Sequence, residues 1–339
     1  MPNASPKHDA VWVRELAAEL KLKGHPVKRL LAQAGLDARA INAEGARIPF
    51  DKYAAFFELA AEATGDDCLG LHFGQTRDMR DAGLIGYVGF SSPTVLDMIN
   101  NLNRYRRVFS DAVEIETGEL EERGRLGWGF RATASQRIIQ ASEFSAVNLL
   151  RTLRQMTGRN LTPRTVSLAH ARNHRTKEFE RFFGCPVTFG RHQNVVEFKL
   201  SDLHVPILTS DSRLLAILRA HCEDVLSRHP EQTPSLVERV ERLITDRMTL
   251  GGAKLEYVAT ELGMGPRTLS RRLTEHGTTF IAIIEELRKE LALKFLDDSN
   301  LVLTEIAFLL GYTEISTFSN AFKRWTGKSP AAYRRERAA

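Results

Sequence analysis

Apolar residues recur at helical spacing in two consecutive stretches near the end of the chain. The two sets of positions are Ile306, Ala307, Leu309 and Leu310, followed by Phe318, Phe322 and Trp325. Their spacing predicts two short helices, each with one buried face. Between them, Gly311 can take the left-handed conformation that ends a helix, and Thr313 is a good N-cap for the next one. The pattern therefore predicts a helix, a tight turn and a helix.

A second copy of this pattern lies upstream, between residues 257 and 280. Its apolar positions Val258, Ala259, Leu262, Leu269 and Leu273 repeat Ile306, Ala307, Leu310, Phe318 and Phe322. The offset is 48 residues up to the glycines and 49 after them, so the first turn is one residue shorter. Gly265 lies at its cap position and Pro266 in the first helical turn, where a missing N–H costs nothing. We expect the two motifs at about 255–276 and 303–326.

The segment between the motifs, residues 280–296, keeps helical periodicity without Gly or Pro. It predicts one continuous helix of about 25 Å, at 1.5 Å per residue. A rigid helix would hold the two motifs at a fixed distance. Such a pair suits successive major-groove faces on one side of a duplex, which lie roughly 34 Å apart.

The second helix of each motif is predicted to expose short hydrogen-bonding groups and cations. These positions are Arg267, Thr268, Ser270, Arg271 and Arg272 in the first motif, and Ile315, Ser316, Ser319, Asn320 and Lys323 in the second. Arginine is the commonest specific reader of guanine, asparagine pairs with adenine, and an apolar side chain contacts the thymine methyl group. One such motif occurs in many all-α proteins, but two copies on one rod indicate binding to double-stranded DNA.

The residues from about 234 to 335 resemble the AraC/XylS transcriptional regulators. The most specific part of the resemblance is the segment "IAFLLGY…FSNAFKRWTGKSPAAYR". It implies that Arg267, Ser270 and Arg271 contact DNA in the first motif, and it implies the same of the second-motif positions Ile315, Ser316, Ser319 and Asn320. Lys254 and Val302 depart from the family pattern, because Ser or Thr caps usually stand there; each loss costs about 1 kcal/mol at most.

The part of the chain before this region mixes helical and strand patterns. Helical patterns run over 11–24, 25–36, 51–65, 92–109, 135–158 and 210–226, and strand patterns run over 112–117, 125–130, 165–170 and 195–200. The predicted fold class is an α+β domain, 1–230, followed by an all-α domain, 235–339, in which a long helix joins the two motifs. The boundary is expected at Ser227–Ser235, where two prolines interrupt the helical patterns.

The order of segments between residues 25 and 210 resembles the arabinose-binding-type sensor domain of the OruR/VirS-like branch of the same family. The resemblance implies a small-molecule effector, a homodimer, contact with RNA polymerase and activation of transcription, although repression stays open. It names no effector. Arg77, Arg80 and Arg106 are the candidate effector-binding residues, and a carboxylate would suit them if they converge. The alternative is a first domain that only dimerises or binds a protein partner.

Composition adds little to the case for DNA, but it bears on the compartment. The net charge is +5, yet residues 231–339 hold 16 Lys and Arg against 15 Asp and Glu, so any basic character there is local. The local clusters are Arg267, Arg271 and Arg272, then Lys323, Arg324 and Lys328, then Arg334, Arg335 and Arg337, and we expect them to anchor phosphates.

The start of the chain has no signal-peptide pattern, and no run of about 18 apolar residues occurs. The three widely spaced cysteines are expected to be reduced, so we predict a cytoplasmic protein without membrane association.

Enzyme classes are disfavoured by the spacing of their motifs. "TGKS" at 326–329 resembles the end of a phosphate loop, but the first glycine would fall at Phe322. "GWGFRA" at 127–132 fits G-x-G-x-x-A, yet no acidic residue stands near position 150 to bind a ribose. We therefore predict no phosphate or dinucleotide loop.

Histidine and cysteine pairs are the other candidates for chemistry. His170 and His174 lie four apart after a predicted strand, where such a pair is more often solvated than bound to a metal. His221 and Cys222 are the nearest match to the reactive cysteine of a DNA-repair alkyl acceptor, but their helical pattern favours a half-buried structural pair. We predict no enzyme, no cofactor and no metal.

Overall fold

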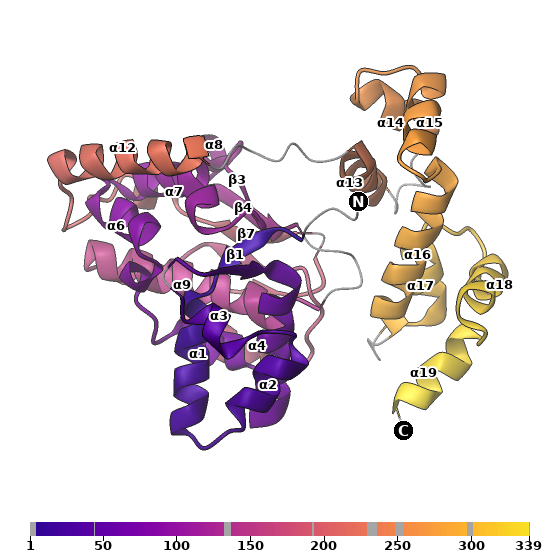
Figure 1. Ribbon diagram of the computed structural model, residues 1–339, viewed down its shortest axis with the longest axis horizontal. Helices are drawn as coiled ribbons and strands as arrows, with labels where there is room; N and C mark the ends of the chain where they lie inside the picture. The colour runs from indigo at the N-terminus through magenta and orange to yellow at the C-terminus, as the bar shows by residue number, and fades with distance from the viewer. Residues whose placement is uncertain are drawn as a thin grey trace. The chain divides into compact units, whose positions relative to one another are not determined.

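The computed structural model describes residues 5–43, 45–131, 137–191, 193–228, 236–247, 254–296 and 301–338 (Figure 1). The described residues up to 228 form one compact unit, and those from 236 onward form a second. Most of the predicted boundary, from residue 229 to residue 235, lies outside the described residues. Its first two residues, Ser227 and Arg228, end the helix α12.

The first unit consists mainly of helices, together with two small sheets. Its helices are α1 (Val11–Leu22), α2 (Val27–Gln33), α3 (Ala38–Ile41), α4 (Phe50–Thr64), α5 (Leu69–Gly74), the 3-10 helix η1 (Met79–Ala82), α6 (Leu84–Ser91), α7 (Val95–Phe109), α8 (Leu120–Arg123), α9 (Ile139–Thr157), α10 (Thr176–Phe183), α11 (Leu200–Leu203) and α12 (Ser212–Arg228). All six predicted helices are present, as α1, α2, α4, α7, α9 and α12. The shorter helices α3, α5, α6, α8, α10 and α11 were not predicted.

The strands of the first unit form two sheets. They are β1 (Lys7–Asp9), β2 (Arg47–Pro49), β3 (Val113–Glu116), β4 (Arg125–Phe130), β5 (Thr165–Ser167), β6 (Val187–Thr188) and β7 (Asn194–Glu197). β1 pairs with β2, and the larger sheet has the order β3-β4-β7-β5-β6, antiparallel except between β5 and β6. The four predicted strands are β3, β4, β5 and β7. The three missed strands are two or three residues long, too short for a periodic signal.

The core of the first unit consists of two apolar clusters, and α9 contributes to both of them. Phe144 belongs to the cluster around α1 and α4, and Leu150 and Leu153 belong to the cluster around the large sheet. β4 places Leu126 and Trp128 in the second cluster. The alternation predicted for this strand therefore directs its large side chains into the core.

The second unit is entirely helical in its described residues. It contains α13 (Leu236–Arg247), α14 (Leu255–Glu261), α15 (Pro266–Glu275), α16 (Phe280–Leu296), α17 (Leu303–Leu309), α18 (Ile315–Thr326) and α19 (Pro330–Ala338). The predicted long helix is α16, with the predicted ends. The predicted α+β class of the first part and the all-α class of the second are both confirmed.

The turn before α18 differs from the prediction at one residue. Gly311 has the expected left-handed φ of 74°. The N-cap of α18, however, is Glu314 rather than Thr313, and its side chain forms no capping hydrogen bond. An acidic residue here is favourable because it lies beside the positive end of the helix dipole.

Candidate nucleic-acid interface

The first motif is formed by α14 and α15, whose packing fixes the direction of every α15 side chain. Gly265 is the N-cap of α15 and Pro266 its first residue, as the sequence predicts. Leu269 and Leu273, one turn apart, are fully buried. Because these two leucines anchor one face, the opposite face of α15 points to solvent.

The exposed face of α15 carries most of the first-motif positions singled out by the sequence. Its exposed members are Arg267, Ser270, Arg271 and Arg272, whereas Thr268 is half-buried. Arg271 lies 3.7 Å from Glu275 on the same helix, and both side chains are largely exposed. An exposed pair of this kind is weak, so Arg271 can exchange Glu275 for a base or a phosphate at little cost.

The second motif repeats this arrangement in α17 and α18. Phe318 and Phe322 are fully buried, in the positions that Leu269 and Leu273 occupy in the first motif. The α18 positions singled out by the sequence are Ile315, Ser316, Asn320 and Lys323, which are exposed, and Ser319, which is half-buried. Ile315 is 39% exposed, and an apolar side chain exposed among polar neighbours suits contact with a thymine methyl group.

Glu314 is a polar neighbour of this face that the sequence reasoning missed. The Ser316 hydroxyl donates a hydrogen bond to the Glu314 carboxylate, 3.1 Å away. A carboxylate here repels phosphate, but it can accept a hydrogen bond from the amino group of cytosine. Its place directly before the predicted helix was the only signal in the sequence.

α16 is tied to the second motif by two arginine contacts. Arg288 donates from Nε to the Leu310 carbonyl oxygen, at 3.0 Å, and stacks over the Tyr312 ring. Arg324 forms an ion pair with Glu285 of α16 at 2.5 Å. The partly buried Arg288 contacts hold the second motif against the long helix, whereas the exposed Arg324 pair adds little to this packing.

Several of the C-terminal basic residues that were expected to anchor phosphates also have partners within the second unit. Besides Arg324, Lys328 pairs with Glu336, and Arg334 donates to the Leu296 carbonyl oxygen. Those three cations have internal partners, because acidic and carbonyl groups from other helices approach them in the fold. Lys323 and Arg335 are exposed. The side chain of Arg337 lies outside the described residues.

The three candidate effector arginines have separate partners in the first unit. Arg77 pairs with Glu19 at 3.1 Å, and Arg80 pairs with Asp78 at 2.6 Å. Arg106 lines a cavity with a volume of about 170 Å³, and neither Arg77 nor Arg80 is among the residues that line it. Arg77 and Arg80 were candidates because they stand just before the segment "GLIGYVGF", but acidic partners that the sequence pattern did not reveal engage both of them.

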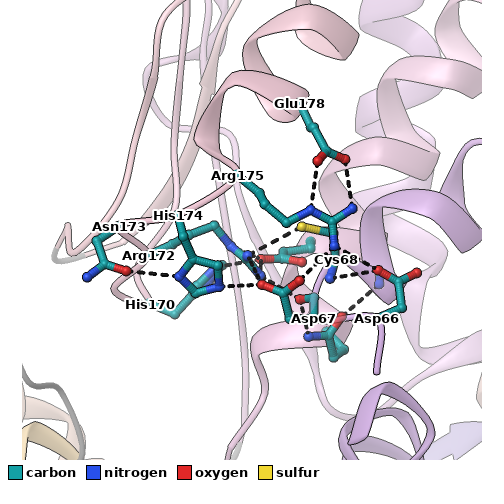
Figure 2. A network of polar contacts seen from close by, with 12 residues as sticks. Asp66, Asp67, Cys68, His170, Arg172, Asn173, His174, Arg175 and Glu178 are labelled. Atoms are coloured by element: carbon teal, nitrogen blue, oxygen red, sulfur yellow. Dashed lines mark hydrogen bonds and ion pairs between the residues drawn. The ribbon is translucent and has the colours of Figure 1, made fainter. Parts of the chain in front are cut away.

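The two predicted solvated histidines have different environments, within a network of polar contacts (Figure 2). His174 is exposed and contacts the Asp67 carboxylate. His170 is buried, and its Nε2 lies 2.9 Å from Oε1 of the fully buried Glu143. The expectation of a solvated pair is therefore wrong for His170, because α9 brings a carboxylate to it.

Arginines balance the buried charge in this network. Arg172 contacts Glu143 at 2.7 Å and Asp67 at 3.0 Å, and Arg175 contacts Asp67 and Glu178, each at 2.7 Å (Figure 2). Desolvation is the largest effect on Asp67 and raises its pKa. The hydrogen bonds from Arg175, His174 and Arg172 together outweigh it and hold the pKa at about 2. These contacts join the loop before α5, which contains Asp67, to the loop before α10, which contains Arg172 and Arg175.

The rival catalytic motifs do not have the surroundings that their chemistry needs. "GWGFRA" begins inside β4 instead of forming a loop before a helix. Cys222 is fully buried, and burial raises the pKa of its thiol to about 11, so it is protonated and unreactive at neutral pH. All three cysteines are free and buried. Within the described ranges, no group of three or more His, Cys, Asp or Glu side chains is placed to hold a metal ion, and no helix is long and apolar enough to cross a membrane.

Comparisons with known proteins agree on one family. Residues 24–207 match the arabinose-binding N-terminal domain of AraC transcription regulators, and residues 258–336 match a helix-turn-helix domain. The ornithine utilization regulator of Pseudomonas aeruginosa is 30% identical over 311 residues, which cover 89% of this chain and 90% of that protein. The transcriptional regulator VirS of Mycobacterium tuberculosis is 29% identical over 280 residues, which cover 81% of this chain and 82% of that protein. The chain therefore belongs to the AraC family of transcription regulators.

Proposed function

We propose that this regulator reads promoter DNA with α15 and α18, and that its first unit dimerises and binds a small molecule that controls activation. The observation that carries the DNA part is the repeated geometry of the two motifs. In each motif, two large apolar side chains anchor the second helix, so that its polar face is turned to solvent. A rigid α16 between the motifs suits two successive turns of the major groove.

Within α15, Arg271 is proposed as the base reader. Its side chain is 73% exposed, and its ion pair to Glu275, at 3.7 Å, is loose. Arg267 and Arg272 are exposed at either side, so they suit contacts to flanking phosphates. In α18, Asn320 and Ile315 are proposed to read the other half of the site. Ser316, Ser319 and Lys323 are proposed to contact the DNA beside them.

A dimer of such readers would bind neighbouring sites together and contact RNA polymerase from a fixed position. Small-molecule control requires that the effector bind the DNA-competent state more tightly than the other state. The cavity beside Arg106 is the feature that favours an effector over a first unit that only dimerises. Constitutive or partner-controlled regulation is the alternative.

The test is Arg271→Ala, measured by gel shift against a promoter fragment and all single-base changes in its site. We expect a loss of about 1 to 3 kcal/mol on the cognate site, and relaxed preference at one or two adjacent base pairs, because a bidentate contact to guanine is removed. Arg39→Ala is the matched control, because it removes the same charge from an exposed position on α3 of the first unit. A uniform loss on all sequences would contradict the base-reading role and make Arg271 a phosphate anchor.

A further inference from the structure

The first unit contains a cavity of about 170 Å³ whose walls are mainly aromatic and aliphatic. It is lined from β1, α1, α4, α7, β3, β4 and α9, with Trp12, Tyr53, Phe109, Phe130 and Phe144 among its aromatic walls. An apolar cavity of about 150 Å³ is large enough to hold a benzene molecule. This cavity therefore suits a molecule of about one ring.

Four of the buried polar side chains that line this cavity have an atom without a hydrogen-bond partner among the described residues. They are His8, Trp128, Asn148 and Thr152, each no more than 7% exposed. Among the described residues, none forms a hydrogen bond with His8 Nε2, Trp128 Nε1, Asn148 Oδ1 or Thr152 Oγ1. A buried polar atom without a partner is costly, and native proteins rarely keep several in one place without a ligand or water.

The hydrogen bonds around His8 indicate which of its two ring nitrogens carries the proton. The Ser110 hydroxyl oxygen accepts hydrogen bonds from the backbone N–H groups of Ala112 and Val113. Its own proton is therefore directed to Nδ1 of His8, 2.7 Å away. This places the imidazole proton on Nε2, which becomes a donor. Burial, with a smaller effect from Arg47, lowers the pKa of His8 to about 3, so the ring is neutral.

The charges around the cavity limit the charge of its occupant. Arg106 is the one ionic side chain among the described residues that line it. Its Nε and Nη1 already donate to the carbonyl oxygens of Val113 and Asn103, at 3.1 and 2.8 Å. A cation would have no counter-ion there. A carboxylate would lose its hydration without gaining a bidentate contact from a free guanidinium group, so the free energy of its burial would be unfavourable.

We propose that this cavity binds an uncharged molecule of about one ring that carries a hydroxyl or carbonyl group, hydrogen-bonded by His8, Trp128, Asn148 and Thr152. The proposal rests on the sensor role suggested above and specifies its ligand class. A hydroxyl or carbonyl oxygen accepts from the His8 and Trp128 N–H groups. A hydroxyl or amide group also donates to Asn148 Oδ1, and Thr152 can do either. The aromatic walls contact the ring.

The experiment is isothermal titration of the full-length protein with matched single-ring probes. Benzyl alcohol and benzamide are the uncharged polar probes, benzoate and benzylamine are the charged isosteres, and benzene has no polar group. We expect benzyl alcohol or benzamide to bind at least about tenfold more tightly than benzene and both charged probes, because only they satisfy the polar atoms without desolvating a charge. Tighter binding of benzoate or benzylamine would overturn the ligand class, while the sensor role would stand.

Two valine substitutions on α9 test the site itself. Thr152→Val removes an unpaired hydroxyl and keeps the volume, so we expect the free protein to stay as stable while the dissociation constant of the bound uncharged probe rises about five- to tenfold. Thr157→Val is the control: Thr157 is buried on the same helix and donates to the Leu153 carbonyl oxygen, but it does not line the cavity. An equal effect of both variants, or no binding of either uncharged probe, would overturn the proposal and leave the cavity to water. DNA binding is measured on the same samples, so a failure of the cavity to bind the uncharged probes is distinguishable from a failure of the protein to bind DNA.

Discussion

Single residues in the first unit show how buried charge is tolerated in this fold. Glu143 is fully buried, and Arg172 and His170 both contact its carboxylate. Removing one partner of such a cluster would leave an uncompensated charge, which is far more costly than an exposed pair. The cluster therefore has a structural explanation and needs no catalytic role.

Asp67 gives this network a measurable pH dependence. Its folded pKa, about 2, lies below the usual value for aspartate, so its stabilising effect is complete above about pH 4 and is lost as the pH falls through 2. Asp67→Asn should therefore lower the free energy of unfolding at neutral pH and flatten its decline between about pH 4 and 2. Because Asp67 is 41% exposed, the expected loss at neutral pH is only about 1 kcal/mol.

Urea unfolding at a series of pH values would measure the Asp67 effect. Asp224→Asn is the control, because Asp224 forms an exposed pair with Arg228, one turn along α12. It should change neither the stability nor its pH profile appreciably. An unchanged slope in Asp67→Asn would mean that Arg172, His174 and Arg175 do not stabilise the folded state through this carboxylate.

At the scale of elements, α15 and α18 are proposed to read different halves of one site. If they do, Asn320→Ala should alter base preference about one helical turn away from the positions that respond to Arg271→Ala, and leave those positions unchanged. Footprinting and base-substitution gel shifts would measure this. Protection of a single turn per subunit would contradict the two-reader arrangement and make α17 and α18 a scaffold.

The elements that the sequence predicted are those with long or repeated periodicity. α16 has the predicted ends because seventeen residues without Gly or Pro give a clear signal. α5 was not predicted, because Gly70 and Gly74 weaken helix propensity. Their role is tertiary: a Cβ atom at Gly70 would come within 2.3 Å of the Gln140 carbonyl oxygen of α9.

The same distinction applies to the candidate sites: a site that follows from local periodicity could be predicted from the sequence, and a site that depends on long-range contacts could not. The exposed face of α15 could be predicted because the periodicity that buries Leu269 also exposes Arg271. The cavity could not, because it depends on His8, Trp128 and Thr152 approaching one another from β1, β4 and α9. Non-local pairing likewise engages Arg77 with Glu19, across 58 residues. Sequence spacing carries no information on such contacts.

At the scale of the whole molecule, the proposed roles of the two units can be separated by experiment. Both predicted helix–turn–helix motifs lie in the second unit. Residues 235–339 alone should therefore bind a single site with nearly the affinity of the full chain. The full chain should gain more on paired sites, because the proposed dimerisation through residues 1–230 would make the second contact intramolecular.

Affinities for one site, for two correctly spaced sites and for two sites offset by half a helical turn would test this division of roles. We expect the fragment to bind each site of a pair independently. The full chain should bind the correctly spaced pair about 10²- to 10⁴-fold more tightly than one site, and lose this gain on the offset pair, where one dimer cannot engage both sites. Sedimentation of the full chain should then show a dimer. A full chain that gains nothing on paired sites would contradict dimerisation through the first unit, whereas a fragment that binds no site would contradict the assignment of DNA recognition to the second unit alone.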